Sequence, residues 1–379
     1  MRTNLFYLLL ITITIVSCKS NKISENKKYS QDFEMNIKKS INENATDLLS
    51  NPSIHSVSIG IYSKGKEITE HFGELDKGKG NKPTNNTIYE IASVTKTMTG
   101  TLVAKAVMEG KINLDDDIRN YMKGEYPNLS YKKQPIKIRH LLTHTSRLPS
   151  EIYGLDKFFQ NNDMRGALKY ANNYRKKEFF RDLKLIKIDT LPGTKYMYSA
   201  NGANLLGYIL EDIYNKTYLE LLNETIFQKS GMKNTKLKLT EKDLEIYSNG
   251  YDGQGNVTPM QPSFLLGAEG QLKSNTSDLI NYMKFQLDNE NKIVKETRKQ
   301  INANSAPMGY FWLIEDQNNF TFYKHPGTAI GTTNWFIICP KYDIGISVIV
   351  SSRFKGSVDI VYDKAINLMN DLIKLNKEE

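Results

Sequence analysis

The chain has 379 residues, with 51 Lys and Arg, 42 Asp and Glu and a formal net charge of +9. This length suits one large domain or two coupled domains. Positive charge is typical of nucleic-acid binding, but basic and acidic residues are interleaved here and no dense basic block with aromatic residues occurs. We therefore expect no nucleic-acid partner, and interpret the charge as a solvated surface that favours anionic lipids or wall polymers.

The first 30 residues predict export and a membrane anchor. Arg2 precedes an apolar run over 5–16, which is too short to span a bilayer of about 30 Å and is typical of a signal peptide. Cys18 follows a small residue at the expected cleavage point, an arrangement that resembles a bacterial lipobox. This resemblance implies a signal peptide over 1–17, a lipid on Cys18 and a polar tether over 18–30. The alternative is cleavage by an ordinary signal peptidase, which leaves Cys18 free.

The second cysteine, Cys339, lies inside the apolar run W-F-I-I-C-P. If Cys18 carries a lipid, no disulfide can form within the chain, so the core must supply the stability. We expect Cys339 to be a small buried residue rather than a reactive thiol.

Hydrophobic periodicity predicts strands near both ends of the chain and helices between them. The elements expected in the N-terminal part are a helix over 31–50, a hairpin of strands over 56–62 and 67–72, a loop over 73–87 and a helix from Ser93 to Gly110. Those expected in the middle are helices over 138–143, 164–174, 204–214, 218–227 and 277–287. Those expected at the end are strands over 309–314, 320–325, 334–339 and 344–350 and a helix over 358–375.

This order of elements predicts a mixed α/β (α+β) protein. The folded part would cover 31–379, with a sheet region over about 31–110 and 262–379. A helical region over about 111–261 would be inserted between the two parts of the sheet.

The spacing Ser-x-x-Lys draws attention to Ser93, although spacing alone is weak evidence. Ser93 differs from other such serines because it stands at the start of an apolar helix, with Lys96 one turn further on the same face. A hydroxyl and an amine held in this way are the minimal parts of a nucleophile and its base, and a helix N-terminus favours a developing anion. The alternative is a plain N-cap serine. The spacing occurs at Ser24, Ser63, Ser93, Ser130, Ser230 and Ser352.

Six blocks of sequence support the interpretation of Ser93 as a nucleophile. They are I-Y-E-I-A-S-V-T-K-T-M-T-G and its continuation over 88–118, I-R-H-L-L-T-H-T-S-R-L-P over 138–149, P-G-T-K-Y-M-Y-S-A-N-G-A-N-L-L-G-Y-I-L-E over 192–211, S-G-M-K-N-T over 230–235, G-A-E-G-Q-L-K-S-N-T-S-D-L over 267–279, and H-P-G-T-A-I-G over 325–331. In this order they resemble the serine β-lactamase and penicillin-binding-protein superfamily, in particular its class C-like branch. The resemblance covers roughly 55–365. It implies a β-lactamase/transpeptidase-like fold, a mainly antiparallel sheet flanked by helices.

The resemblance also implies roles for individual residues. Ser93 would be the acylated nucleophile, Lys96 its partner amine and Tyr198 the tyrosine of the second motif. A lysine and a tyrosine in water are mostly protonated at neutral pH. An ammonium beside a phenol favours the phenolate, and burial favours a neutral amine, so either group can assist as a base. Without the flanking P-G-T-K and L-L-G, Tyr198 would be interpreted as a packing aromatic.

His325, Pro326 and Gly327 fall where the family carries Lys or His, any residue, then Gly on a strand that lines the site. We expect the glycine to let substrate lie against the strand backbone. The resemblance also implies that the amides of Ser93 and Thr328 form an oxyanion hole. For His325 alone, a surface imidazole would be the default interpretation.

Three positions depart from the family pattern. Ala200 replaces the asparagine that often ends the second motif and that contacts the acylamide group of antibiotics in lactamases; Asn201 comes one step late and would point elsewhere. His325 replaces the lysine near the substrate carboxylate, and a neutral imidazole is a poorer partner for an anion. Arg147 stands where the family usually has glycine.

His140 and His144 suggest a competing hypothesis. Their i, i+4 spacing would place two imidazoles on one helix face, as in zinc hydrolases. The sequence between them, H-L-L-T-H, lacks the glutamate of that motif, and no third ligand cluster occurs. We therefore expect neither a metal nor another cofactor.

The sequence thus predicts a serine hydrolase in the cell envelope, anchored to a bacterial membrane through Cys18. It would act through a Ser93 acyl-enzyme on a small ester, an amide or a D-amino-acid peptide. A class C-like β-lactamase is the alternative, and a non-catalytic penicillin-binding or wall-sensing module is a second one. We expect a monomer.

Overall fold

The computed structural model describes residues 32–161, 163–261, 265–302, 306–317 and 319–377. The predicted signal peptide, the tether and Cys18 lie outside these ranges. Within the described part of the chain, no helix is both long and apolar enough to cross a membrane.

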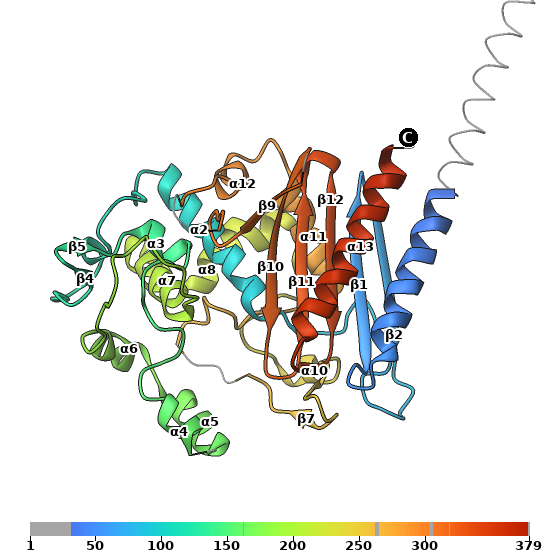
Figure 1. Ribbon diagram of the computed structural model, residues 1–379, viewed down its shortest axis with the longest axis horizontal. Helices are drawn as coiled ribbons and strands as arrows, with labels where there is room; N and C mark the ends of the chain where they lie inside the picture. The colour runs from blue at the N-terminus through green and yellow to red at the C-terminus, as the bar shows by residue number, and fades with distance from the viewer. Residues whose placement is uncertain (1–31, 162, 262–264, 303–305, 318, 378–379) are drawn as a thin grey trace, which may run out of the picture.

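A six-stranded sheet, with every neighbouring pair antiparallel, forms the centre of the molecule (Figure 1). Its order, β2-β1-β12-β11-β10-β9, places the N-terminal hairpin beside the last strand of the chain. For example, Val57 of β1 is opposite Val350 of β12. The strands are β1 (Ser56–Ser63), β2 (Lys66–Gly73), β9 (Leu313–Gln317), β10 (Phe320–Thr328), β11 (Thr333–Cys339) and β12 (Ile344–Val350). The prediction of a sheet built from both ends of the chain is confirmed.

Two helices cover one face of this sheet, the outer face. They are the N-terminal helix over 32–50 and α13 (Ser357–Lys377), the red helix in front of the sheet in Figure 1. The apolar stripe of the N-terminal helix is buried here together with Leu368 and Leu372 of α13; it consists of Phe33, Ile37, Ile41, Ala45 and Leu48. Cys339 has no exposed surface and burial raises the pKa of its thiol to about 11, so its predicted role as a buried residue is confirmed.

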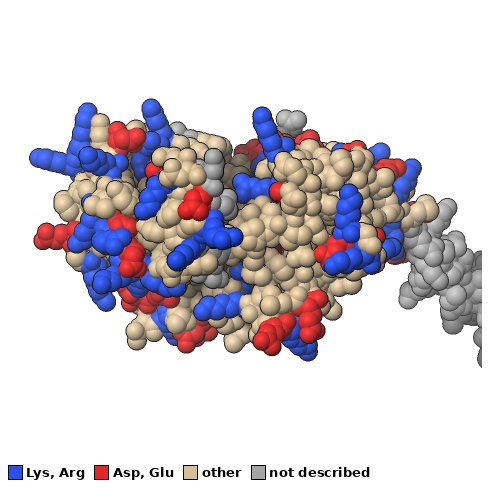
Figure 2. All heavy atoms as spheres, turned by 90° about the horizontal axis from the view of Figure 1, so that it is seen from below, with Lys and Arg blue, Asp and Glu red and all other residues tan. Residues whose placement is uncertain are grey.

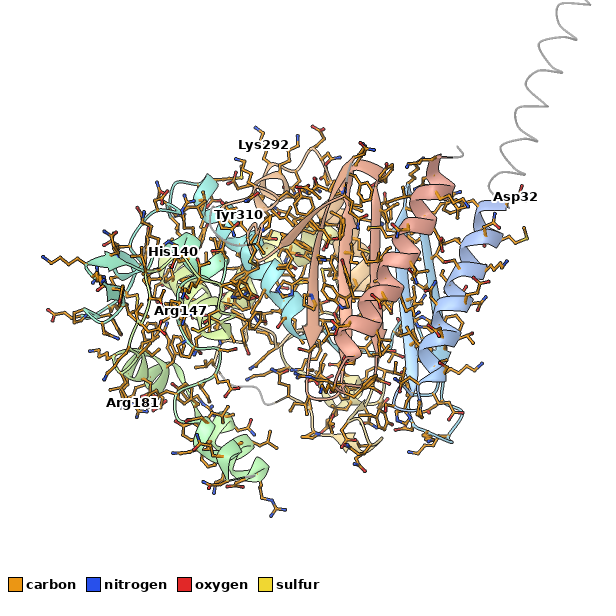
Figure 3. All side chains as sticks on the ribbon, viewed as in Figure 1. Asp32, His140, Arg147, Arg181, Lys292 and Tyr310 are labelled. Carbon is orange, nitrogen blue, oxygen red and sulfur yellow. The ribbon has the colours of Figure 1, made fainter. Side chains whose placement is uncertain are left out.

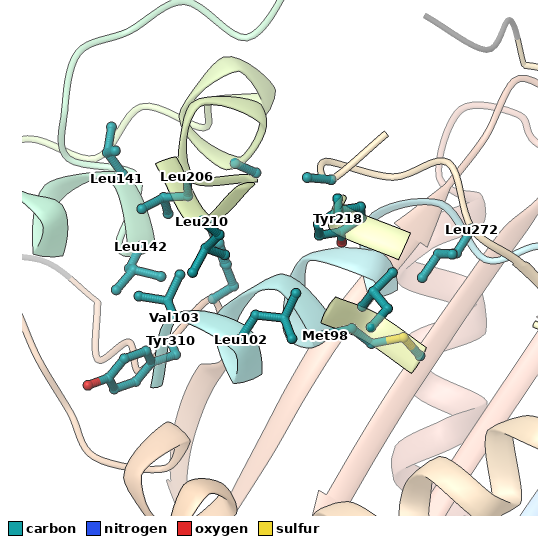
Figure 4. Close-up of a cluster of buried hydrophobic side chains, with 14 of the residues drawn as sticks. Met98, Leu102, Val103, Leu141, Leu142, Leu206, Leu210, Tyr218, Leu272 and Tyr310 are labelled. Carbon is teal, nitrogen blue, oxygen red and sulfur yellow. The ribbon is translucent and has the colours of Figure 1, made fainter. Parts of the chain in front are cut away.

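The other face, the inner face, packs against helix α11 (Thr276–Leu287) and a larger helical region. In that region α2 (Thr95–Met108) lies at the centre of a second apolar core that also contains Leu141, Leu206 and Leu210 (Figure 4). The other helices of eight residues or more are α5 (Met164–Asn173), α6 (Lys176–Leu183) and α7 (Ala200–Tyr214). The shorter ones are α3 (Ile138–Leu142), α4 (Asp156–Gln160), α8 (Tyr218–Leu222), α9 (Gln228–Ser230), α10 (Glu241–Leu244) and α12 (Lys292–Thr297). Lys and Arg are prominent over the helical region, at the left of Figure 2.

Short elements complete the fold. Four one-turn helical segments are η1 (Ala92–Val94), η2 (Ile118–Tyr121), η3 (Asn223–Phe227) and η4 (Pro340–Tyr342), of which η3 is a π-helix. Three two-stranded ribbons are β3 (Tyr89–Glu90) with β8 (Lys273–Ser274), β4 (Ser130–Tyr131) with β5 (Gln134–Pro135), and β6 (Gly250–Tyr251) with β7 (Val257–Thr258).

The strand predicted over 309–314 is wrong for its first four residues, since β9 begins at Leu313. Tyr310, Phe311 and Trp312 are fully buried in the inner core without forming a strand. The segment packs closely on α2: a Cβ added to Gly100 would lie 2.2 Å from the carbonyl oxygen of Tyr310. The apolar run therefore reflects core packing, which hydrophobicity alone does not distinguish from a buried strand.

Two boundaries in the helical region also differ from prediction. The helix expected over 218–227 is α-helical only as far as Leu222 and continues as the π-helix η3. Helix α7 begins one turn before the predicted Asn204, because the Ser199 hydroxyl accepts a hydrogen bond from the amide of Gly202 and caps the helix there. That cap places the start of α7 directly after Tyr198.

Candidate active site

Ser93 lies in a tight turn between β3 and α2. It belongs to the one-turn 3-10 helix η1, and the α-helix proper begins two residues later, at Thr95. Ala92, the residue before it, has a φ of 46°, a left-handed conformation that residues with a side chain adopt at a cost of about 1–3 kcal/mol. The strained turn holds Ser93 at the N-terminal end of α2, where the helix dipole favours negative charge.

The structure brings Ser93, Lys96 and Tyr198 together. The hydroxyl oxygens of Ser93 and Tyr198 are 2.6 Å apart, and Lys96 Nζ donates a hydrogen bond to Ser93 Oγ at 3.1 Å. Lys96 is 1% exposed and its Nζ lies 4.9 Å from the centre of the Tyr198 ring. Because the lysine donates to Oγ, the serine is free to direct its own proton at the oxygen of Tyr198. This is the geometry that a nucleophile and its base require.

His144 holds Tyr198 in place. The His144 ring lies 4.4 Å from the Tyr198 ring, its Nδ1 accepts a hydrogen bond from the Ser199 amide at 3.2 Å, and its carbonyl accepts one from the Met197 amide at 2.7 Å. Burial and the nearby Lys96 lower the pKa of His144 well below the usual value, so the ring is neutral. Sequence analysis did not find this positioning role. The T-H-T-S segment is part of a recognised block, but nothing in its spacing points to Tyr198.

Strand β10 passes beside the turn that carries Ser93. A Cβ added to Gly327 would lie 2.3 Å from the carbonyl oxygen of Ile91 and 2.4 Å from the side chain of Asn334. The glycine therefore allows β10 to approach the nucleophile turn, which is a different reason from the expected contact between substrate and strand backbone. Thr328, the last residue of β10, lines the same cavity as Ser93.

His325 is buried beneath the site. It is 2% exposed, and its Nδ1 lies 2.7 Å from the carbonyl oxygen of Pro326, to which the protonated nitrogen donates. Burial and Lys96 lower its pKa to about 3. The imidazole is therefore uncharged at neutral pH and offers no cation to a substrate carboxylate.

A cavity of about 520 Å³ opens over Ser93. Lys96, Tyr198 and Thr328 line it on the catalytic side. The wall from the segment over 150–171 is largely apolar and includes Ile152, Leu155, Ala167, Leu168 and Ala171. Arg353 supplies a cation at the edge, and one of its nitrogens donates to the carbonyl oxygen of Ala329 at 3.1 Å. The site thus combines a nucleophile with its lysine and tyrosine, an apolar wall and a second basic side chain, Arg353.

Ala200 and Asn201 both line the cavity, although Asn201 was expected to point elsewhere. The side-chain amide of Asn201 donates to the carbonyl oxygens of Pro149 and Glu151, at 3.0 and 2.8 Å, and so fixes the loop that forms the apolar wall. The amide that the family pattern places at position 200 is therefore replaced here by a methyl group.

Arg147 has a backbone φ of 66°, in the left-handed region that glycine adopts without strain. Its guanidinium makes two hydrogen bonds to Asp189, at 2.9 and 3.0 Å, and lowers the pKa of that carboxyl to about 2. Figure 3 shows Arg147 within the helical region. The positive φ explains why glycine suits this position.

The zinc hypothesis has no structural basis in the described residues. Helix α3 ends at Leu142, so His144 lies beyond it and does not share a helix face with His140. His140 Nδ1 accepts from the Lys137 amide and His144 Nδ1 from the Ser199 amide. Among the described residues, no group of three or more His, Cys, Asp or Glu side chains is placed to hold a metal.

Two further polar residues line the cavity, Asn204 of α7 and Glu269. Asn204 is 1% exposed and Glu269 is 4% exposed. Glu269 also accepts a hydrogen bond from Lys96 through its backbone carbonyl. Both residues lie inside blocks that sequence analysis recognised, but a sequence does not show which residues of a block face a cavity.

Comparison with known proteins places this chain in a family. The model of the Beta-lactamase family matches residues 41–368. The chain belongs to the beta-lactamase family. It is 28% identical over 313 residues to "Protein flp" of Staphylococcus aureus strain N315, an alignment that covers 79% of this chain and 60% of that protein. The chain therefore spans about 60% of the length of that relative.

Solved structures agree on the fold. The beta-lactamase/D-alanine carboxypeptidase from Yersinia pestis superimposes with a TM-score of 0.74 at 24% identity, over 90% of this chain and 99% of that one. A class C beta-lactamase mutant gives a TM-score of 0.75 at 19% identity, over 88% and 97% of the two chains. The predicted superfamily and the predicted fold class are confirmed, and the chain is a member of a family of serine hydrolases.

Proposed function

We propose that this protein is a serine hydrolase in which Ser93 forms an acyl-enzyme, with Lys96 and Tyr198 as general base and acid. The observation that carries the proposal is the hydrogen-bonded trio in the cavity, with the Tyr198 oxygen 2.6 Å and Lys96 Nζ 3.1 Å from Ser93 Oγ. Tyr198 would take the serine proton as the oxygen attacks a carbonyl carbon. It would then return the proton to the leaving group, and water would hydrolyse the acyl-enzyme.

We propose a small ester, an amide or a D-amino-acid peptide as the substrate, ahead of a β-lactam antibiotic. The family's contact to the acylamide group of antibiotics is absent at Ala200, and His325 is neutral. The amides of Ser93 and Thr328 would stabilise the oxyanion, which is worth about 2.7–4 kcal/mol per donor in such sites. Arg353 supports a substrate whose leaving group, rather than its acyl chain, carries a carboxylate.

A panel of substrates tests this function with the chain over 25–379. We expect turnover of p-nitrophenyl acetate and of a D-alanyl peptide or depsipeptide, with slow turnover of nitrocefin. If nitrocefin has the highest kcat/KM, the protein is a β-lactamase. If ligands bind but none of the three is turned over, it is a non-catalytic binding or sensing module.

We also propose that the protein works at the cell envelope, anchored to a bacterial membrane through Cys18 and acting as a monomer. Fractionation of cells that express the full chain tests the anchor: the wild type should sediment with membranes, and Cys18→Ala should not. A wild-type protein that stays in the soluble fraction would contradict the anchor. Size-exclusion chromatography with light scattering tests the monomer.

A further inference from the structure

The cavity is lined by two buried polar side chains that have unpaired polar atoms. Asn204 and Glu269 both line the cavity, although 1% and 4% of their surfaces are exposed. By hydrogen-bond geometry neither the amide nitrogen nor the amide oxygen of Asn204 has a partner, and neither does Oε2 of Glu269, although Asn204 lies close enough to the Glu269 carboxyl to lower its pKa. The other carboxyl oxygen of Glu269 accepts from Gln271 at a long 3.4 Å.

Unpaired groups of this kind destabilise the protein that contains them. A buried donor or acceptor left unsatisfied costs about as much as its desolvation, and native proteins pair nearly all such groups. Leucine at position 204 would avoid this cost. Because both side chains line the cavity, a group that enters it can supply the missing partners.

These side chains lie close to the reacting serine. Lys96 donates to Ser93 Oγ and also to the backbone carbonyl of Glu269, so a single side chain separates the nucleophile from Glu269. Ala200 and Asn204 are four residues apart on α7 and therefore lie on the same helix face, and both line the cavity. The small Ala200 side chain leaves room to reach the amide one turn further along.

The unpaired atoms define what they would bind. The nitrogen of Asn204 needs an acceptor, whereas the oxygens of Asn204 and Glu269 need donors. A carboxylate brings no donor and is repelled by an ionised Glu269. An ammonium brings no acceptor and is repelled by the nearby Lys96. A carboxamide offers both a carbonyl oxygen and N–H groups, and it is uncharged.

We propose that Asn204 and Glu269 form a subsite for an uncharged carboxamide group carried on the short acyl chain that becomes attached to Ser93. The inference rests on the proposed function, because it assigns the substrate class of the same site. Burial raises the pKa of the Glu269 carboxyl, with Lys96 opposing the rise. The same loss of contact with water that disfavours the charged form of Glu269 disfavours a charged group bound beside it.

The test compares p-nitrophenyl esters whose acyl chains have equal length and end in a carboxamide, a carboxylate or an isopropyl group. These three ends have nearly the same shape and differ in hydrogen bonding and charge. With chains of two to four methylenes and with spontaneous hydrolysis subtracted, we expect kcat/KM to be at least about 10-fold higher for the carboxamide than for the isopropyl ester at the best length. The carboxylate ester should be the poorest.

Two variants test the contributions of Asn204 and Glu269 one at a time. Asn204→Leu should bring the ratio of carboxamide to isopropyl turnover close to one, and should raise the melting temperature by a few degrees because the unpaired amide is gone. Glu269→Gln should improve the carboxylate ester relative to the carboxamide. Thr225→Val is the matched control: Thr225 is 1% exposed with an unpaired hydroxyl and lies in η3, away from the cavity lining. This control should leave both ratios unchanged.

The outcomes distinguish a failure of the proposed subsite from a failure of the proposed serine hydrolase function. Equal kcat/KM for the carboxamide and isopropyl esters in a wild-type enzyme that reacts through Ser93 would overturn the subsite and leave the serine hydrolase intact. A lower melting temperature of Asn204→Leu with an unchanged ratio would show that Asn204 is structural. If no ester is turned over and a serine-reactive probe does not label Ser93, both proposals fail.

Discussion

The two faces of the central sheet are packed in different ways. The outer face lies against the N-terminal helix and α13 through apolar side chains such as Leu368 and Val348. The inner side combines an apolar core with Lys96, Glu269, His144 and His325, all almost fully buried. Buried polar groups of this kind reduce stability unless they are paired, and here several are not. Both faces therefore contribute apolar packing to the fold, and the inner side gives up part of its stability to maintain a site.

The largest effect expected from this comparison is on catalysis. Removing the amine on the inner side in Lys96→Met should lower kcat/KM for a turned-over ester by about 10²–10⁴-fold, because no other cation donates to Ser93 Oγ in the described residues. Steady-state kinetics with active-site titration measures it. A loss of less than about threefold would show that Lys96 does not assist the reaction.

A change on the outer face should affect stability alone. Leu368 is fully buried in α13, and Leu368→Ala should lower the free energy of unfolding by about 2–5 kcal/mol, the range for deleting a buried leucine side chain. Urea denaturation measures the loss. The kcat per folded molecule should stay at the wild-type value. A specific loss of kcat in folded Leu368→Ala would contradict the separation of the two faces.

Gly327 lies where the sheet meets the site, and its replacement should affect both stability and catalysis. The added methyl group of Gly327→Ala meets the Ile91 carbonyl, so β10 and the Ser93 turn must separate. We expect a loss of about 1–3 kcal/mol in stability together with a fall in kcat. Gly202→Ala is the control, since its Cβ would meet nothing closer than 3.5 Å on α7. Wild-type activity in Gly327→Ala would show that the close approach is not required.

The last effect is a pH dependence that arises on the inner side and develops gradually over several pH units. The folded pKa of His325 is about 3, below the unfolded value of about 6.5, so unfolding takes up a proton between these values. Stability from this residue is present above pH 6.5 and is lost as the pH falls toward 3, by at most about 1.4 kcal/mol per pH unit. His325→Gln should therefore lose less stability than the wild type between pH 6 and 4.

Buried Glu90 and Glu269 have raised pKa values and act in the opposite direction, but they are present in both proteins and cancel in the comparison. Urea denaturation of the wild type and His325→Gln at several pH values isolates the histidine. Parallel curves would mean that His325 is not buried and neutral in the folded protein.

The sequence predicted much of the fold because the relevant patterns are local. The stripe of the N-terminal helix, the strands β1, β10, β11 and β12 and the helix over 358–375 all follow the period of the apolar residues. Prediction was wrong over 309–312, where an apolar run packs on Gly100 of α2 without forming a strand. Tertiary packing decided that segment, and local pattern does not reveal it.

The site was only partly predictable for the same reason. Ser93, Lys96 and Tyr198 were found because they lie in recognisable blocks, and the structure brings them within hydrogen-bonding or ring contact of one another. The positioning role of His144 depends on contacts across 54 residues, and the cavity-facing orientation of Asn204 and Glu269 depends on how α7 meets the loop before β8. Such relations exist only in the folded chain.

One measurement tests the central claim most directly: the site of covalent labelling by a fluorophosphonate or penicillin probe, located by peptide mass spectrometry. We expect one adduct on Ser93, no adduct in Ser93→Ala, and full labelling in Ser230→Ala, whose serine has the same spacing to a lysine but donates to the Ile226 carbonyl in a helix. Full labelling of Ser93→Ala, or an adduct on another serine of the wild type, would contradict the account.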